Sequence, residues 1–399
     1  MTSTKLLDTI SSLEELARSA PQELHDQDGL RKRLLDAVQK LVPEIETPAE
    51  MSQRLLYLPC EIMGAKIGVD LDIFNVLSAS DRPLSTEELA QNCGAESALL
   101  LRLLKYMSSV RLIKESDTGL WVPSNMTRNL ASRHSAAGVN HVHDSVMPAY
   151  HALPSWLNRR GYKTPTAKTD TPFAQGHGAS PDQSFFSWLQ VHPYNATEFN
   201  IFMGVHRTGM KTWLDQGKIH GSLCKAHEAG GDENGAMFVD VGGGIGQQCK
   251  ALRARYPELK GRIILQDLPQ VIQKADVGDD IEAMSMDFFE GQPIKSATVY
   301  YLRSILRDWP DAQCRTILGH IRDAMAAHSL IFIDELVLPD RGAHKVETQL
   351  DMTMLSMLNG EARTESHWRR LLEESGLKVQ DIVSYQNAGS EAVIVAKGK

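Results

Sequence analysis

The run FVDVGGGIGQ, from Phe238 to Gln247, decides the fold of this chain. A short apolar stretch, residues 237–241, leads into the run 242–246, four of whose five residues are glycine, and a helical pattern follows. Glycines after a strand let the backbone approach a ligand closely at the start of a helix, as nucleotide sites require. The run therefore predicts a strand, loop and helix that bind a nucleotide-like cofactor, although such a run is weak evidence alone.

Further apolar stretches in the second half of the chain indicate more strands. They alternate with helical patterns, which is typical of a doubly wound, mostly parallel α/β sheet with ligand sites at the carboxyl ends of its strands. We expect a Rossmann-like domain over residues 216–399. The predicted strands are 237–241, 263–266, 297–302, 330–334 and 392–396.

Three acidic residues lie near successive strand ends. Asp240 lies just before the glycine run, and Asp267 ends the second strand, where it could take the hydroxyls of a ribose. Asp287, with Phe288 beside it, lies where the next loop could meet an adenine. The alternative for each acid is a surface side chain that caps a helix. Three acids in equivalent places favour the cofactor site.

The first half of the chain is predicted to be helical, with apolar residues at helical spacing over 6–18, 30–41 and 51–77. Ser85 and Ser97 then each open a further helix, and residues 112–122 predict a small hairpin. Two helices and a hairpin describe a winged-helix unit. Because this unit is not strongly basic, we expect packing or dimerisation rather than DNA binding.

The composition of the segment 132–183 turns rich in His, Pro, Gly, Thr and Ser, which predicts loops and short helices over a pocket or surface. We therefore expect a helical, winged-helix dimerisation domain over residues 1–135 and a helical linker with the substrate pocket over 136–215.

Bulk composition excludes several classes of protein. With 399 residues and 42% hydrophobic content, the chain can form two globular domains. Its formal net charge of -8 argues against nucleic acid or an anionic membrane as a partner. Five cysteines without CxxC spacing indicate reduced thiols, with no disulfide framework and no metal site. No signal-peptide pattern opens the chain, so we expect a cytoplasmic enzyme of small molecules.

The runs FVDVGGGIGQ, LQDLP, MDFF, YLRSILRDWPDAQCRTIL, IFIDELVLP and GEARTESHWRRLLEESGL resemble the class I plant and fungal small-molecule O-methyltransferases, which bind S-adenosylmethionine. The resemblance extends over nearly the whole chain, and it implies an intertwined homodimer formed by the N-terminal half. It also implies that Gly242 and Gly244 line the methionine end of the cofactor and Asp267 the ribose, while Asp287 and Phe288 hold the adenine.

The chain departs from this family at the catalytic base. The family has a His directly before Asp-Trp, and here that position is Arg307, which stays protonated and cannot accept a proton. Of the two family glutamates that orient the His, one is matched by Glu335, whereas the other position is Ala362, with Glu361 shifted by one. Arg303 stands where the family has a basic residue near the cofactor.

Three interpretations follow from this departure. The chain is a methyltransferase whose base lies elsewhere, for instance His141, His143 or His151, or whose substrate ionises without help. Alternatively, it is an inactive partner protein. In the third and favoured interpretation, S-adenosylmethionine is bound but not consumed, and its sulfonium supplies fixed positive charge. The chain resembles the fungal O-methyltransferase-like pericyclases, in which an Arg-Asp pair replaces the His-Asp pair.

That resemblance implies roles for four residues acting on a polyketide- or pyridone-like substrate. Arg307 would donate hydrogen bonds to a substrate carbonyl. Asp308 and His143 would move protons as an alcohol loses water to give a quinone methide, and Arg207 would anchor the substrate. The alternatives are that Asp308 caps the helix starting near Pro310, and that Arg207 lies on the surface.

Overall fold

The computed structural model describes residues 3–18, 24, 27–205, 212–230, 232, 234–385 and 391–399. The chain divides into two compact units, Met1–Ile62 and Met63–Lys399. The domain boundaries expected near residues 135 and 215 stay predictions.

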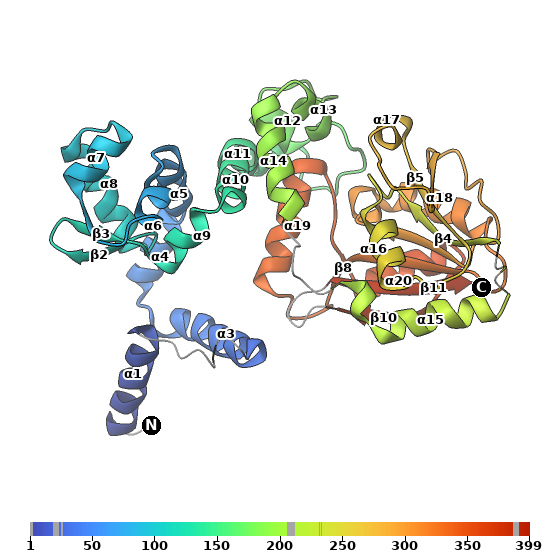
Figure 1. Ribbon diagram of the computed structural model, residues 1–399, viewed down its shortest axis with the longest axis horizontal. Helices are drawn as coiled ribbons and strands as arrows, with labels where there is room; N and C mark the ends of the chain where they lie inside the picture. Colours follow the sequence, from blue (N-terminus) through green and yellow to red (C-terminus); the bar gives the residue numbers. More distant parts are fainter. Residues whose placement is uncertain are drawn as a thin grey trace. The chain divides into compact units, whose positions relative to one another are not determined.

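The first unit is helical, as expected (Figure 1). Thr47 and Glu50 form a capping box at the start of its third described helix, with the Thr47 N–H donating to the Glu50 carboxylate at 2.8 Å. The single helical pattern predicted over 51–77 is interrupted, because Pro59 has no N–H to continue a helix and Asp72 has a left-handed φ of 56°. The first unit contains α1 (Ser3–Arg18), α3 (Asp28–Ile45), α4 (Pro48–Tyr57) and the start of α5 (Pro59–Asp70), whereas α6 (Ile73–Ser78) belongs to the second unit.

The predicted winged-helix elements are present in the second unit. Ser85 caps its helix in a capping box with Glu88, and the hairpin turns at 117–119 as expected. The buried Trp121 indole donates to Thr86 Oγ1 at 3.0 Å, which ties the hairpin to that helix. These elements are β1 (Leu84–Ser85), α7 (Thr86–Cys93), α8 (Ser97–Ser109), β2 (Lys114–Asp117), β3 (Leu120–Val122) and α9 (Asn125–Leu130).

The segment after residue 132 is more helical than its composition suggests. Its first part runs without a break from α10 (Arg133–His141) through a π-helical turn, η1 (Val142–Val146), into α11 (Met147–Arg159). A buried apolar cluster containing Phe173, Phe185 and Trp188 gives these residues the packing that composition alone does not reveal. The later helices are α12 (Pro172–Gly176), α13 (Phe185–Gln190) and α14 (Pro193–Val205).

The C-terminal part forms one mixed, mostly parallel sheet in the order β10-β11-β8-β7-β4-β5-β6, with β9 paired to β8. All pairings are parallel except those of β11, which runs antiparallel to β8 and β10. The Rossmann-like fold class is therefore confirmed. The strands are β4 (Ala236–Val241), β5 (Arg262–Asp267), β6 (Ile281–Ser285), β7 (Val299–Arg303), β8 (Leu330–Leu338), β9 (Arg363–Thr364), β10 (Leu377–Ser384) and β11 (Glu391–Gly398).

Helices cover both faces of this sheet (Figure 1). One buried cluster joins the sheet to α18 (Asp311–Arg322) and α20 (Glu365–Glu374), and the other joins it to α15 (Gly217–Glu228) and α16 (Gln247–Arg255). Strand β4 contributes to both clusters, since Phe238 packs in one and Val239 in the other. The short elements are η2 (Trp213–Asp215), α17 (Pro269–Ile272) and η3 (Leu306–Asp308).

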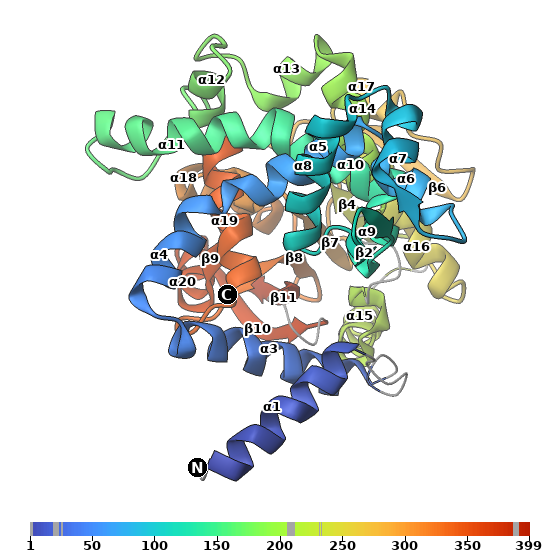
Figure 2. The same ribbon diagram turned by 90° about the vertical axis from the view of Figure 1, so that its left-hand side faces the viewer.

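One long helix connects the sheet region to the helical segment before it. Helix α19 (Lys345–Leu358) contacts α11, α12 and η1, and Figure 2 shows it beneath α11. Its buried Met357 joins the same apolar cluster as Phe185 and Trp188. No helix among the described residues is long and apolar enough to cross a bilayer.

Candidate active site

The glycine loop after β4 has the backbone conformation that the sequence predicted. Gly242 and Gly244 have φ values of 73° and 63°, which L side chains rarely adopt. The N–H groups of Gly242 and Gly243 donate to the Gln266 carbonyl at 2.8 and 3.1 Å. A Cβ at Gly242 would lie 2.6 Å from the side chain of Ile305, so a larger residue has no room there. The loop is a tightly held cradle.

Asp267 lies at this loop, as expected. One of its carboxylate oxygens accepts a hydrogen bond from the Gly244 N–H at 2.8 Å, and the other accepts one from the Leu268 N–H at 2.7 Å. Each carboxylate oxygen has a second lone pair for a ligand hydroxyl. The structure therefore brings together Gly242, Gly244 and Asp267 at the carboxyl ends of β4 and β5.

Asp287 and Phe288 complete the same side of the site. A Phe288 ring atom lies 3.7 Å from where a Gly242 Cβ would stand, so the ring borders the glycine cradle. Asp287 accepts a hydrogen bond from the Phe289 N–H at 2.9 Å and caps a turn rather than a helix. A cradle without side chains, an acid with free acceptor positions and an aromatic ring fit the nucleoside of S-adenosylmethionine.

Arg303 occupies a buried polar cluster behind the loop. Its Nε lies 3.4 Å from Oδ2 of Asp334, which also accepts a hydrogen bond from the Tyr301 hydroxyl at 2.5 Å, while the other oxygen of Asp334 accepts one from the Tyr385 hydroxyl at 2.6 Å. Burial raises the pKa of Asp240, beneath the loop, to about 7, although Arg303 opposes this. The contact of Arg303 with the cofactor stays a prediction.

Arg307 is paired with Glu335, which matches one of the two glutamates that orient the histidine base in the family. It lies on η3, after β7, with a side chain that is 14% exposed, and its Nε is 3.6 Å from the carboxylate of Glu335 on β8. Glu335 also accepts a hydrogen bond from the Arg307 backbone N–H at 3.2 Å. Neither terminal nitrogen of the guanidinium makes a hydrogen bond within the described ranges of the chain. These donors are available to a ligand.

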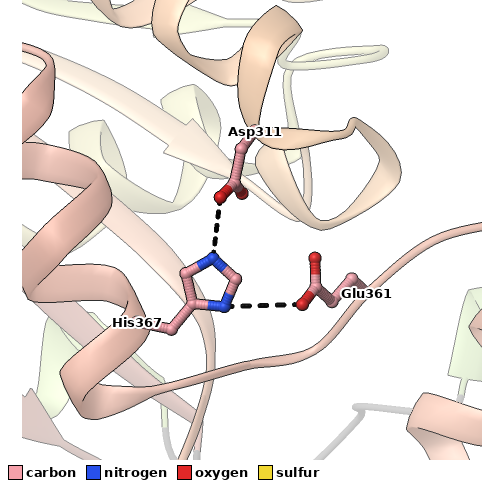
Figure 3. A group of neighbouring side chains, drawn as sticks. All are labelled: Asp311, Glu361 and His367. Carbon is pink, nitrogen blue, oxygen red and sulfur yellow. Dashed lines mark hydrogen bonds and ion pairs between the residues drawn. The ribbon is translucent and has the colours of Figure 1, made fainter. Parts of the chain in front are cut away.

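The shifted Glu361 does not replace the second family glutamate. Its carboxylate lies 3.4 Å from Nδ1 of His367, whose Nε2 is 2.8 Å from Asp311 (Figure 3). Only its backbone N–H reaches Arg307, donating to the Arg307 carbonyl at 2.9 Å. Of the two acids near the expected positions, only Glu335 pairs with the Arg307 side chain.

The group Asp311, Glu361 and His367 has spacing that would suit a metal ion, with its ligand atoms within 4.8 Å of one another. However, the fully buried Arg363 lies 2.9 Å from Asp311 and 3.8 Å from Glu361, so protein cations already compensate both carboxylates. Although burial opposes it, bonding from His367 and Arg363 holds the pKa of Asp311 below its usual value. We interpret the group as an ion-pair network that fixes the segment after Arg307.

Asp308 does not cap the following helix. The N-cap of α18 is Pro310, and no side chain caps that end. Burial raises the pKa of the Asp308 carboxyl, while the cations Lys168 and Arg307 oppose the rise. The sequence did not point to Lys168, because it lies in a loop far along the chain with no motif around it. The alternative role for Asp308 is thereby removed.

The three histidines named from the sequence lie in different surroundings. His143 lies in the π-helical turn η1 and is half-exposed, with Nδ1 2.7 Å from the Asp144 carboxylate. His141 is buried against Phe185, Phe199 and Phe202, and burial lowers its pKa to about 4.

His151 is exposed. No hydrogen bond or ion pair joins His143 to Arg307 or Asp308 in the described structure; the link between them is indirect, since η1 contacts α19. Arg207 lies outside the described residues.

A cavity of about 640 Å³ opens beside the segment that follows Arg307. Its lining includes the apolar Trp309 and Leu355, but most of its residues are polar or charged, among them Asp351 and Glu361. Its volume is in the range of small-molecule pockets, although such pockets are usually lined by more apolar residues.

The chain belongs to the O-methyltransferase family. The model of the O-methyltransferase domain matches residues 233–378, and that of the O-methyltransferase dimerisation domain matches residues 54–133. Together with the glycine cradle and Asp267, this establishes the protein as an S-adenosylmethionine-binding enzyme of that family.

Two fungal relatives match along almost their whole length. The O-methyltransferase ucdC of Aspergillus ustus is 37% identical over 92% of this chain and 95% of its own. The O-methyltransferase lepI of Aspergillus flavus is 36% identical over 95% of this chain and 96% of its own.

Solved structures of LepI are similar too. The complex of LepI with SAM is 34% identical and superposes with a TM-score of 0.82 over 100% of both chains. A structure described as a pericyclic reaction enzyme is also 34% identical, with a TM-score of 0.81 over 99% of this chain and 100% of that chain.

Proposed function

We propose that this protein is a non-methylating pericyclase of fungal secondary metabolism. It binds S-adenosylmethionine, removes water from a polyketide or pyridone alcohol to give a quinone methide, and directs the cyclisation of that product by a hetero-Diels–Alder or related reaction. The observation that carries the proposal is Arg307, held by Glu335 at the position of the family base with its terminal nitrogens available. The likeness to LepI and to a pericyclic reaction enzyme supports it.

Arg307 activates the substrate rather than removing a proton. Its guanidinium stays charged, and its planar fork suits a carbonyl oxygen that gains negative charge as bonds reorganise. Glu335 fixes the Nε side of the group, so the orientation of the fork is set before the substrate binds. Such pre-orientation avoids reorganisation in the transition state.

Asp308 and His143 carry the protons of the dehydration. The substrate loses a proton to one of them, its C–O bond breaks, and the departing hydroxyl leaves as water after taking a proton from the other. If the His143 Nδ1–H donates to Asp144, the Nε2 atom is left as the acceptor. Arg207 anchors the substrate in this proposal.

The cofactor-binding residues would hold S-adenosylmethionine, which carries a positive charge, in the site. Gly242 and Gly244 would line its methionine end, Asp267 would bind the ribose, and Asp287 and Phe288 would hold the adenine. When bound, S-adenosylmethionine supplies the fixed positive charge of its sulfonium, which stabilises negative charge developing on a substrate oxygen.

Methyl transfer to a phenolic or polyketide hydroxyl is the second candidate. It is favoured by the retained Glu335 and by the 37% identity to the O-methyltransferase ucdC. A base other than Arg307 would then be required. His141 is neutral because of its low pKa, but its surroundings are aromatic and buried.

One experiment separates these functions. The purified protein is incubated with candidate pyridone alcohols and methyl-labelled S-adenosylmethionine, and the products are analysed by mass spectrometry. The pericyclase gives cyclised product without label and without S-adenosylhomocysteine. Stoichiometric formation of S-adenosylhomocysteine would instead establish a methyltransferase, and an absence of turnover with all substrates would favour an inactive binding partner.

A further inference from the structure

The loop that carries Lys168 is fixed on both sides of this residue. The Asn359 side-chain amide donates to the carbonyl of Ala167 at 2.9 Å and to that of Thr169 at 3.3 Å. The next residue, Asp170, is anchored as well, since the Trp156 indole donates to its carbonyl at 2.8 Å. The backbone of Lys168 is therefore held in place before any ligand binds.

The same turn that holds this loop also holds Arg307. Asn359 ends α19 in a left-handed conformation with a φ of 53°, and Glu361, two residues later, donates its N–H to the Arg307 carbonyl at 2.9 Å. A Cβ on the intervening Gly360 would stand 3.0 Å from that carbonyl oxygen, so the approach is close. One turn thus sets the position of Lys168 relative to the Arg307–Trp309 segment.

The Lys168 ammonium lies over an aromatic ring of the site. Its Nζ is 3.3 Å from the centroid of the Trp309 ring, a cation–π contact. Trp309 is itself held edge-on by Phe289, with ring centroids 4.7 Å apart. The cation therefore lies over the side chain of the residue that directly follows Asp308 in the chain.

Lys168 is one of two cations that oppose the effect of burial on Asp308. Burial raises the pKa of Asp308, and Lys168 counteracts this rise more than the adjacent Arg307 does. In return, burial lowers the pKa of Lys168 and Asp308 raises it. The other charged or titratable groups near this pair are Glu335 from β8, which interacts with Asp308, and Cys314 from α18, which interacts with Lys168.

We propose that Lys168 is a further positioning residue of this site, whose ammonium keeps the Asp308 carboxylate ionised and able to accept a proton. This inference rests on the proposed function, in which Asp308 moves a proton of the substrate. The loop of residues 160–171, which connects α11 to α12, thereby has a role in the reaction as well.

The first measurement does not depend on activity. The free energy of unfolding is compared between the parent protein and D308N as a function of pH, in the native background and in K168M. Because burial raises the pKa of Asp308, its contribution to stability is present at low pH and is lost as pH rises through the folded pKa. Without the lysine charge, the pKa of Asp308 in the folded K168M protein should be higher. The pH at which its contribution to stability is fully lost should therefore rise by about one unit or more.

The second measurement is the pH profile of turnover. The acidic limb of the profile should move to higher pH by about one unit in K168M and in K168Q, and K168R should restore it. K295M removes a lysine charge at an exposed position and should leave the profile unchanged. S-adenosylmethionine binding checks that each variant is folded.

The outcomes are distinct. The inference is supported if, in K168M, both the pH dependence of the stability difference and the acidic limb of the turnover profile shift to higher pH. If the pH dependence of the stability difference between the parent protein and D308N is the same in K168M as in the native background, Lys168 does not control Asp308, and the inference fails whatever the protein catalyses. If the stability difference moves but the acidic limb does not, the positioning role is overturned, and the failure lies in the proposed use of Asp308 as a base.

Discussion

Glu335 binds Arg307 at two points, accepting its backbone N–H at 3.2 Å and lying 3.6 Å from its side-chain Nε. Burial raises the pKa of Glu335, and Arg307 is the cation that chiefly opposes this rise. An acid that would orient a histidine base in the family thus orients a cation here. The pair keeps part of the frame of the family site, although the histidine of the family is replaced by Arg307.

We predict that R307M destabilises the protein by several kcal/mol, about 3–5, because it leaves a buried carboxylate without its cation. The double variant R307M/E335Q should recover much of this loss, since the uncompensated charge is gone. Urea unfolding of both single variants and the double variant measures the coupling between the two residues. Additive effects would show that the pair is not coupled.

R307H is predicted to lower cyclisation by about 100-fold or more, because histidine does not offer the charged fork that stabilises the developing oxyanion. R307K keeps the charge and should lose less. Single-turnover assays with labelled S-adenosylmethionine follow product and label together. Methyl transfer that stays equal or rises in R307H would instead identify a methyltransferase.

D267N should weaken binding of S-adenosylmethionine by about 10–100-fold, because it removes a charged acceptor at the ribose and disturbs the bond from the Gly244 N–H. Calorimetric titration of the protein with the cofactor measures the change. D279N, which alters an exposed acid, should bind as the parent does. Unchanged affinity in D267N would remove Asp267 from the cofactor site.

The cofactor half of the site could be predicted because its determinants are local. A strand, the glycine run and Asp267 follow one another along the chain, and parallel strands bring their carboxyl ends to one edge. The strands β6 and β10 were not predicted from the sequence, because both lie at the edges of the sheet, where fewer residues are buried. Edge strands lack a continuous apolar run.

The other half of the site depends on tertiary contacts. Lys168 lies over Trp309 in a loop that Asn359, far along the chain, and Trp156 hold in place. His143 was expected in a loop, but the packing around Phe173 and Phe185 keeps that segment helical, with a π-helical turn at His143 itself. Such turns are frequent at functional sites, which periodicity along the sequence does not reveal.

D240N should stabilise the protein at pH 8 but not near pH 4. Burial raises the pKa of Asp240 to about 7, so its contribution to folding is present below the ordinary carboxyl pKa and is lost as pH rises toward 7. The gain of D240N over the parent should therefore grow from pH 4 to 8, reaching about 1–4 kcal/mol. Urea unfolding at several pH values measures it, with D276N as the exposed control. A difference that does not vary with pH would contradict the raised pKa.

L56E should prevent self-association. We propose that the protein is a homodimer, because the dimerisation-domain match begins at residue 54 and α4 has no buried residue within one chain. Leu55 and Leu56 are 70% and 73% exposed. If a second copy of the chain buried them, each side chain would stabilise the dimer by about 1.5–3 kcal/mol.

Light scattering during gel filtration should give twice the 44.3 kDa of one chain for the parent and for the control Q273E, which adds a carboxylate at an exposed position outside α4, and a single chain's mass for L56E. A carboxylate placed in an apolar interface costs far more than the lost leucine, because it must be desolvated without a partner. A dimeric L56E would show that the exposed face of α4 lies outside the interface.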